Sequence, residues 1–464
     1  MSRIPAADGG MSPEGQLPIV NVSLSEIGGE ARASFKIAWP LALGAVGHNL
    51  LGVVDTAMVG RLGATELAGV SIGTGIYFAL SVAAMGLVSG LDPLVSQAVG
   101  AGEGTRARAA FRAGIHLALL VAAPTTLAIC LAPYLLPLAG ISPEITDVAR
   151  GFLWARAPGA LPFILMMAIR GLLQARSHTK PMMLGSIVAN ALNIFFNWLL
   201  IFGYEPLGVP ALGVVGSGLA STIATVGQLA LLALALRGLP SLPEGGDADV
   251  PVRKIATIGL PIGLTLLAEV GAFALVGILA GRIGPEAGSG HQVAIQLASL
   301  TFTVSMSIAS ATSVRVGLAV GRRDMHGMRL AGWVGFGTSA AYMSATSILF
   351  LTLAEPLARI MTNRPEVILV AVPLVHIAAA FQLFDGLQVV GAGALRGLGE
   401  TKSVQRANVI GYYVLGLPIA CALAFWLDLA ERGLWWGLCV GLGFVAATVV
   451  VRWAIASKQD VARA

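Results

Sequence analysis

The sequence predicts an all-α integral membrane protein with twelve transmembrane helices in two six-helix lobes, related by a pseudo-twofold axis along the membrane normal. Composition, apolar runs and an internal repeat predict this class. Charged residues make up 11% of the 464 residues and hydrophobic residues 56%, whereas soluble domains are roughly 25% charged. A soluble chain of this length could not bury so much apolar surface, because core volume stops growing with length. Most of the chain must therefore contact lipid.

Long apolar runs recur along the whole chain. A transmembrane helix needs about 20 mostly apolar residues. Twelve runs of this kind are present, at about 36–60, 68–98, 111–137, 152–174, 181–203, 211–236, 254–281, 289–318, 328–352, 367–392, 405–427 and 433–456. They predict a multi-pass protein whose main partner is the lipid bilayer.

The second half of the chain repeats the first. At an offset of 221 residues, 37–40 aligns with 258–261 and 60–63 with 281–284, and at an offset of 222, 179–180 aligns with 401–402. Each half contains six spans, an even number, so both halves insert in the same orientation and the axis relating them lies along the membrane normal. Such repeats are typical of transporters, in which two bundles flank a substrate site.

The chain divides into five segments. We expect a disordered cytoplasmic tail over 1–35, a first lobe over 36–238, a cytoplasmic linker over 239–253, a second lobe over 254–456 and a cytoplasmic tail over 457–464. The linker is the one polar stretch of any length and contains Pro240, Pro243 and Gly245. The first 30 residues lack a basic start followed by a short apolar core, so they do not resemble a signal peptide.

Lys and Arg set the expected orientation. With a cytoplasmic amino terminus, 22 of the 29 basic residues fall on the inner side, as the positive-inside rule requires. The outer side keeps Arg61, Arg150, Arg156, Arg282, Arg359, Arg364 and Arg432. Both termini are therefore expected in the cytoplasm. The net charge of +5 follows from this loop placement, so no nucleic-acid partner is expected. One chain supplies both lobes, so a monomer is expected.

Three acids fall inside apolar spans: Asp55 in the first, Glu269 in the seventh and Asp385 in the tenth. An ionisable group in mid-membrane costs several kcal/mol and usually has a function. Simpler roles remain open, namely a helix-end cap for Asp55 and an interhelical hydrogen bond for Asp385. Asp92 and Glu400 lie near the cytoplasmic ends of spans, where we expect them to be solvated.

Other polar residues accompany these acids. His48 lies seven residues before Asp55, close to the same helix face, and at the 221 offset it is the counterpart of Glu269. It is a candidate proton carrier, although a lone histidine is often a satisfied interior donor. The fifth span contains Asn190, Asn193 and Asn197, which are candidate ligands or interhelical contacts.

The motifs of enzymes and ATP-driven pumps are missing from the sequence. It contains no GxxxxGK[ST] or HExxH, which leaves no signature for ATP binding or zinc proteolysis. We therefore expect no catalytic residues, no enzyme activity and no cofactor beyond a coupling ion. A carboxylate can bind a proton or sodium ion in competition with a cationic substrate, so coupling to an ion gradient is the expected energy source.

Five stretches together resemble a known family. They are 54–60 (VDTAMVG), 193–198 (NIFFNW), 290–294 (GHQVA), 384–393 (FDGLQVVGAG) and 395–397 (LRG). They resemble the multidrug and toxic compound extrusion (MATE) family and, within it, the NorM-type bacterial members. The resemblance covers the chain from about Phe35 to about Arg452.

The resemblance implies a two-lobed antiporter of the bacterial inner membrane that exports bulky cationic or amphipathic compounds against inward Na+ or H+ flow. It implies a first-lobe cation or proton site at Asp55, with Asn193 and Asn197 as partners. It also implies a second-lobe site at Glu269 and Asp385, which is a candidate Na+ site. NorM-type members can place a tyrosine one turn before the tenth-helix acid, where this chain has Phe381. This missing hydroxyl, together with His48 near Asp55, favours H+ over Na+ as the coupling ion.

Two other functions are considered. A flippase for lipid-linked precursors on a related scaffold would line its cavity with arginines that hold phosphate. In this chain the arginines fall at loops, most of them cytoplasmic, with Arg170 the near-exception. A membrane-embedded enzyme has no nucleophile or metal cluster to support it.

Overall fold

A computed structural model describes residues 23–242, 249–459 and 463 of the chain. Twelve helical stretches in these residues are long and apolar enough to cross a membrane, in agreement with the twelve expected spans. Most of the expected first tail and the middle of the expected linker lie outside the described residues.

The first lobe contains eight α-helices that make six spans. They are α1 (Leu24–Val59), α2 (Ala64–Val88), α3 (Leu91–Gly100), α4 (Gly104–Leu131), α5 (Pro143–Arg156), α6 (Ala160–Ala175), α7 (Lys180–Phe202) and α8 (Val214–Arg237). Two spans are broken: α2 and α3 form one, and α5 and α6 form another around a 3₁₀ turn at Ala157–Gly159.

The second lobe begins with four long helices, and its fifth span changes helix type along its length. The elements are α9 (Val252–Ile283), α10 (Pro285–Gly321), α11 (Met325–Met361), α12 (Pro365–Leu398), α13 (Lys402–Val409), η5 (Ile410–Gly416), α14 (Leu417–Cys421), η6 (Ala422–Trp426) and α15 (Ala430–Ala456). Elements η5 and η6 are π-helical. Wide π turns are often found at functional sites, and η5 borders the polar cluster of this lobe described below.

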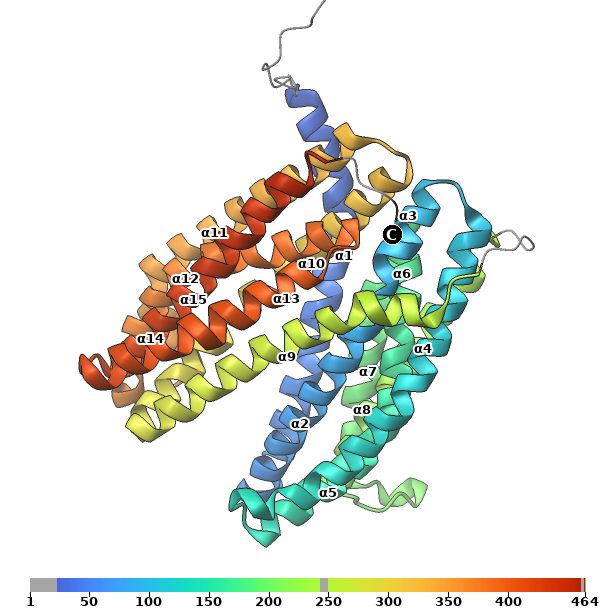
Figure 1. Ribbon diagram of the computed structural model, residues 1–464. Helices are drawn as coiled ribbons and strands as arrows, with labels where there is room; N and C mark the ends of the chain where they lie inside the picture. The colour runs from blue at the N-terminus through green and yellow to red at the C-terminus, as the bar shows by residue number, and fades with distance from the viewer. Residues whose placement is uncertain (1–22, 243–248, 460–462, 464) are drawn as a thin grey trace, which may run out of the picture.

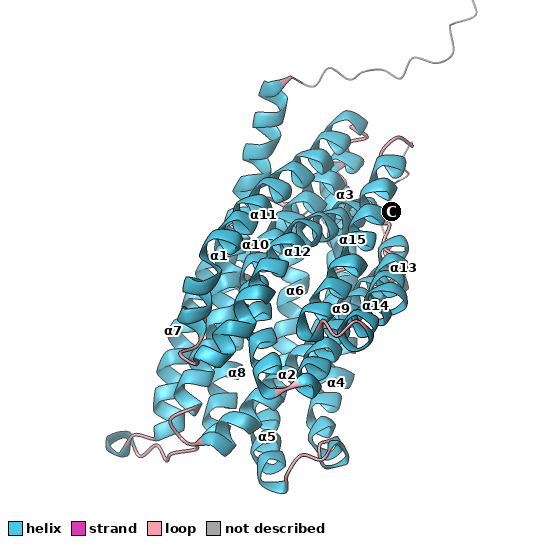
Figure 2. Cartoon of the chain, turned by 90° about the vertical axis from the view of Figure 1, so that its left-hand side faces the viewer, coloured by secondary structure: helices cyan, strands magenta, loops and turns pink. Residues whose placement is uncertain are grey.

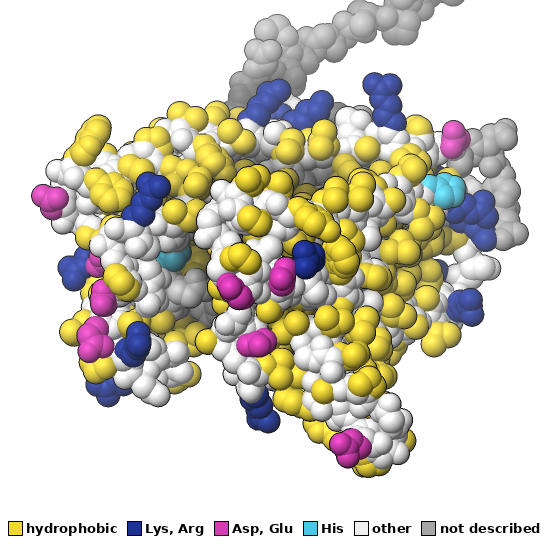
Figure 3. Space-filling view, turned by 90° about the horizontal axis from the view of Figure 1, so that it is seen from below, with side chains coloured by type: hydrophobic (Ala, Val, Ile, Leu, Met, Phe, Trp, Pro, Cys, Tyr) yellow, Lys and Arg dark blue, Asp and Glu magenta, His cyan; other side chains and the backbone are white. Residues whose placement is uncertain are grey.

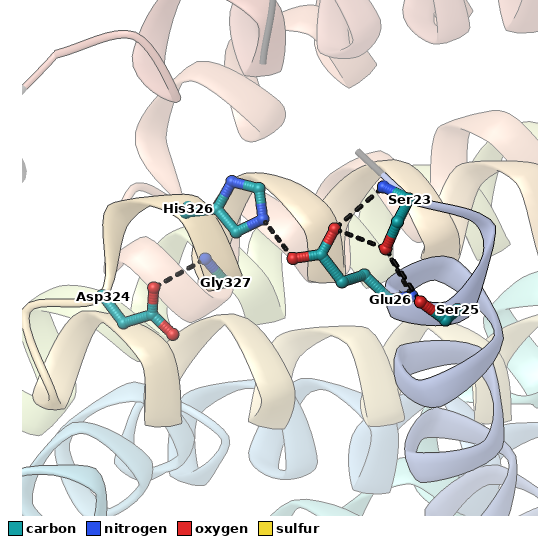
Figure 4. Close-up of polar contacts among 6 residues, drawn as sticks. All are labelled: Ser23, Ser25, Glu26, Asp324, His326 and Gly327. Carbon is teal, nitrogen blue, oxygen red and sulfur yellow. Dashed lines mark hydrogen bonds and ion pairs between the residues drawn. The ribbon is translucent and has the colours of Figure 1, made fainter. Parts of the chain in front are cut away.

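Helix α1 begins earlier than expected from the sequence, because a capping box at Ser23 and Glu26 stabilises its first turn. The Ser23 side chain accepts a hydrogen bond from the Glu26 backbone N–H, and the Glu26 carboxylate accepts one from the Ser23 backbone N–H at 2.8 Å. Figure 4 shows this cap, with the Glu26 carboxylate also 3.6 Å from His326 of α11. Residues 24–35, expected in the disordered tail, therefore extend α1 toward the second lobe.

The second span is broken where the two lobes meet. A Cβ atom at Gly90, between α2 and α3, would overlap the carbonyl oxygen of Ile255 in α9. A Cβ atom at Gly259 would in turn overlap the carbonyl oxygen of Leu87. Only glycine allows these backbones to approach so closely. Helix α3 then packs against α10 and α12 as well as α4 and α6, so it joins the two lobes.

Both described ends of the chain lie on one side of the molecule, which we name the terminal side. Figures 1 and 2 show the start of α1 and the carboxyl end of the chain on this side. In Figure 1 the lobes approach each other there and diverge toward the other side. Seen from that other side, hydrophobic side chains cover much of the surface, and charged side chains are scattered among them (Figure 3).

Polar contacts hold the lobes together on the terminal side. The Arg315 guanidinium of α10 donates to both carboxylate oxygens of Glu30 in α1, at 2.7 and 2.5 Å. The Gln97 amide of α3 donates to the Gly397 carbonyl oxygen at 2.9 Å. Arg463 donates to Glu103 at 2.5 Å and to the Gly321 carbonyl oxygen at 2.6 Å. The protein is therefore closed on this side.

Candidate functional site

Asp55 is the centre of a buried polar cluster in the first lobe. Its Oδ1 accepts hydrogen bonds from the side-chain amides of Asn193 at 2.9 Å and Asn197 at 2.6 Å. Its Oδ2 accepts one from the Ser221 hydroxyl at 2.5 Å. Asn193 and Asn197 are one turn apart on α7 and so share a face. Asp55 is 7% exposed and the two asparagines are fully buried. Three helices thus converge on one carboxylate.

His48 and Asn190 lie outside this cluster. The Asn190 amide donates to the Gly47 carbonyl oxygen at 2.6 Å and to the Ser186 carbonyl oxygen at 2.8 Å. It therefore joins α7 to α1, which agrees with the interhelical role considered for it. The His48 ring stacks on Phe163 with centroids 6.1 Å apart. Within the described part of the chain, no hydrogen bond joins His48 to Asp55.

Glu269 and Asp385 form a second cluster, in the second lobe. Each carboxylate lies within electrostatic reach of the other, and the Gln388 side chain lies close to Glu269. Gln388 also donates to Asn408 at 3.5 Å. Asp385 is 3% exposed, and among the described residues no donor bonds to it. This cluster therefore joins two acids with far fewer donors than Asp55 has.

An aromatic layer covers the second cluster, one helical turn away. Phe273 follows Glu269 by four residues, Phe381 precedes Asp385 by four, and Tyr412 follows Asn408 by four. The Phe273 ring lies 5.8 Å from that of Phe381 and 6.1 Å from that of Tyr412. The Tyr412 hydroxyl is buried and has no hydrogen-bond partner among the described residues. It lies within electrostatic reach of both acids.

Four members of these clusters were not identified from the sequence: Ser221, Gln388, Asn408 and Tyr412. Gln388 stands inside the quoted stretch 384–393, three residues after Asp385, and this spacing could have indicated it. Ser221 and Tyr412 carry no such signal, because their positions depend on how α8 and η5 rotate against neighbouring helices.

Asp92 is buried rather than solvated, which corrects the expectation for it. Its carboxylate oxygen would lie 2.7 Å from a Cβ atom at Gly171, so the missing side chain of Gly171 makes room for it. The opposite charges that act on it are Arg170 of α6 and Arg396 of α12, one from each lobe. Glu400, also expected to be solvated, accepts a hydrogen bond from Arg452 at 2.5 Å. Both acids therefore have basic counterparts.

Arg156, expected on the outer side, lies inside the first lobe. It is the last residue of α5, and its guanidinium donates to the Thr225 hydroxyl of α8 at 3.2 Å. The guanidinium carbon also stands 4.5 Å from the centre of the Tyr77 ring of α2. Arg156 was expected at an outer loop because it lies near the start of the expected span at 152–174. The helix instead begins at Pro143.

Replacement of Asp55 tests the first cluster. We expect Asp55→Asn to lower the free energy of unfolding by about 2 kcal/mol, because hydrogen bonds to a charged group are lost. Thermal unfolding of purified protein measures this. Thr56→Ala is the matched control, since among the described residues the Thr56 hydroxyl bonds only to the Gly52 carbonyl oxygen of its own helix. An Asp55→Asn protein as stable as this control would contradict the cluster.

Twelve candidate spans in two lobes, closed on one side and with an acid cluster in each lobe, form an arrangement typical of membrane transporters. A family model described as MatE matches residues 40–199 and 261–421, once in each lobe. The chain belongs to the MatE family, as the resemblance implied.

Several relatives cover nearly the whole chain. It is 32% identical to the multidrug resistance protein NorM of Aliivibrio fischeri, over 90% of this chain and 93% of that protein. It is 33% identical to the probable multidrug resistance protein NorM of Pseudomonas putida, with the same shares. Among solved structures, the eukaryotic MATE transporter AtDTX14 matches with a TM-score of 0.84 at 21% identity, over 94% of this chain and 98% of that one. This last likeness concerns the fold.

Proposed function

We propose that this protein is a multidrug efflux antiporter that exchanges organic cations or amphipathic compounds for Na+ or H+ by alternating access. Two relatives covering most of the chain carry the name multidrug resistance protein, which supports the substrate class. We place the protein in the bacterial inner membrane as a monomer, with the terminal side facing the cytoplasm. The flippase is not favoured, because the residues of the two clusters are mainly acids and amides.

The contrast between the two acid clusters carries the proposal. Asp55 accepts three hydrogen bonds, so its charge is already stabilised. Glu269 and Asp385 lie within electrostatic reach of each other, and Asp385 has no donor among the described residues. Two carboxylates that share a buried site favour a proton or a bound cation. We therefore assign the coupling cation to Glu269 and Asp385, and a fixed anionic role to Asp55 with Asn193 and Asn197.

Tyr412 supplies the hydroxyl that Phe381 lacks. In the part of the chain that the structure describes, neither its buried oxygen nor the buried Gln388 amide oxygen has a hydrogen-bond partner. Both are oxygen atoms of the kind that a hard cation binds. With the two carboxylates they offer oxygen ligands from four residues to one ion. This donor set supports Na+ as a coupling ion despite the missing tyrosine in the tenth span.

The closed terminal side gives the direction of the cycle. In the proposed orientation this state is closed to the cytoplasm, the state in which an exporter releases substrate outward. Cation binding at Glu269 and Asp385 would remove their negative charge and so weaken the hold on a cationic substrate. Exchange of one cation for the other follows from this competition.

Ethidium transport in energised inverted vesicles tests the proposed function. A sodium gradient and a proton gradient are imposed separately, and collapse of each gradient by an ionophore is the control. We expect at least one gradient to drive ethidium uptake into the vesicles. If neither gradient drove ethidium uptake, the antiport proposal would be contradicted.

A further inference from the structure

Arg156 is a charged residue deep within the first lobe. Helix α5 has 14 residues and begins at Pro143, so at 1.5 Å per residue Arg156 lies roughly 20 Å from the start of the helix. Its neighbours come from two other helices, with Thr225 on α8 and Tyr77 on α2. The guanidinium therefore sits between helices at a depth where a charge is costly.

Among the described residues, this guanidinium lacks the acidic partner that other half-buried arginines have. Arg315 binds Glu30, and Arg463 binds Glu103. No Asp or Glu oxygen of the described residues lies within 4.0 Å of a nitrogen of Arg156. An arginine side chain has five N–H donors, and the Thr225 hydroxyl takes one. The residue is only half-buried, so the remaining donors are not sealed within the protein.

Asp55 is near this guanidinium but occupied by other donors. The Thr225 hydroxyl donates to the Ser221 carbonyl oxygen at 2.8 Å, and the Ser221 hydroxyl donates to Asp55 at 2.5 Å. Thr225 and Ser221 are one turn apart on α8. The Arg156 guanidinium and the Asp55 carboxylate therefore lie beside successive turns of that helix. The first lobe therefore presents a carboxylate whose oxygens are engaged and a guanidinium whose donors are largely free.

We propose that Arg156, Thr225 and Tyr77 form a subsite for the anionic group, such as a carboxylate, of zwitterionic substrates. This proposal rests on the proposed multidrug function and extends its substrate class beyond simple cations. An arginine can bind a carboxylate through two parallel hydrogen bonds. The Tyr77 ring holds the guanidinium through a cation–π contact, and the buried Tyr77 hydroxyl has no hydrogen-bond partner within the described residues. A negative group there also relieves the unpaired charge of Arg156.

A matched pair of dyes tests the subsite. Tetramethylrhodamine carries a free carboxylate beside its cationic ring system, and its methyl ester differs in having that carboxylate blocked. Binding of each dye to the purified full-length protein is measured by fluorescence anisotropy. We expect Arg156→Gln to weaken binding of the carboxylate dye roughly tenfold, equal to about 1.4 kcal/mol. Binding of the ester is expected to stay unchanged, and the unchanged value also shows that the variant is folded.

Two further variants sharpen the result. Arg156→Lys keeps the charge but loses the planar fork, so an intermediate loss for the carboxylate dye is expected. Arg150→Gln is the control, because Arg150 lies on the same helix, is exposed and pairs with Asp147 at 2.9 Å. This control is expected to bind both dyes as the wild type does.

Other outcomes would overturn the subsite. If Arg156→Gln weakened binding of both dyes equally, the role of Arg156 would be that of a structural counter-charge to Asp55. Failure of the wild type to bind the carboxylate dye would also overturn it. Transport is measured separately: selective dye binding without ion-driven export of the ester would contradict the proposed antiport while leaving the subsite supported.

Discussion

Replacement of both second-lobe acids, in Glu269→Gln with Asp385→Asn, is expected to abolish ion-driven dye transport. The amides keep the size of the carboxylates but remove the negative charge that attracts a proton or Na+. Among the described residues no hydrogen bond is made to Asp385, and Gln388 is the amide close to Glu269. Few existing bonds are therefore lost, and the fold should persist. Initial rates of ethidium uptake into inverted vesicles, at equal amounts of protein, measure the effect.

The control for this variant is Glu286→Gln. Glu286 is an exposed acid in the first turn of α10, away from the second-lobe cluster, and its loss should leave transport near the wild-type rate. Transport at the wild-type rate in the double variant would refute the assignment of the coupling cation to Glu269 and Asp385. It would move that role to Asp55.

Loss of the Arg315 charge is expected to open the terminal side. In Arg315→Gln the carboxylate of Glu30, which is 8% exposed, loses its partner. Leaving one member of a buried ion pair unpaired costs about 3 kcal/mol. Separation of the lobes would return water to Glu30 and relieve that cost. Spin labels at Lys180 of α7 and Arg322 after α10, both exposed, should therefore report a longer distance than in the wild type.

A second change distinguishes the ion pair from general damage. In the double variant Glu30→Gln, Arg315→Gln no charge is left unpaired, so much of the closed population should return. An unchanged label distance in Arg315→Gln would show that the Gln97 and Arg463 contacts alone keep the terminal side closed. That result would contradict the importance given to the ion pair.

The sequence was sufficient for the spans and the two lobes, because both follow from properties of long segments. Lipid requires about 20 apolar residues per span, and the repeat relates the halves directly. It was not sufficient for the break at Gly90 or the early start of α1. The break depends on the backbone approach of α9 to Gly90, which no local pattern records. The start depends on the pair Ser23 and Glu26, a capping box inside a stretch of tail-like composition.

For the candidate site, the acids were identifiable and their surroundings were not. An acid in an apolar span is conspicuous, which is why Asp55, Glu269 and Asp385 could be chosen. Helix rotation decides which neighbours face them, so Ser221 and Tyr412 required the structure. Arg156 was misplaced because a count of basic residues by loop cannot detect a cation that turns into the bundle.

The central claim is that a coupling cation and a cationic substrate compete for the charge of Glu269 and Asp385. Binding of tetraphenylphosphonium to the purified protein, measured at a series of sodium concentrations and of pH values, tests it most directly. The account predicts that the affinity falls as sodium or proton concentration rises, and that this dependence disappears in the Glu269→Gln, Asp385→Asn protein. An affinity that neither cation changes in the wild type would contradict it.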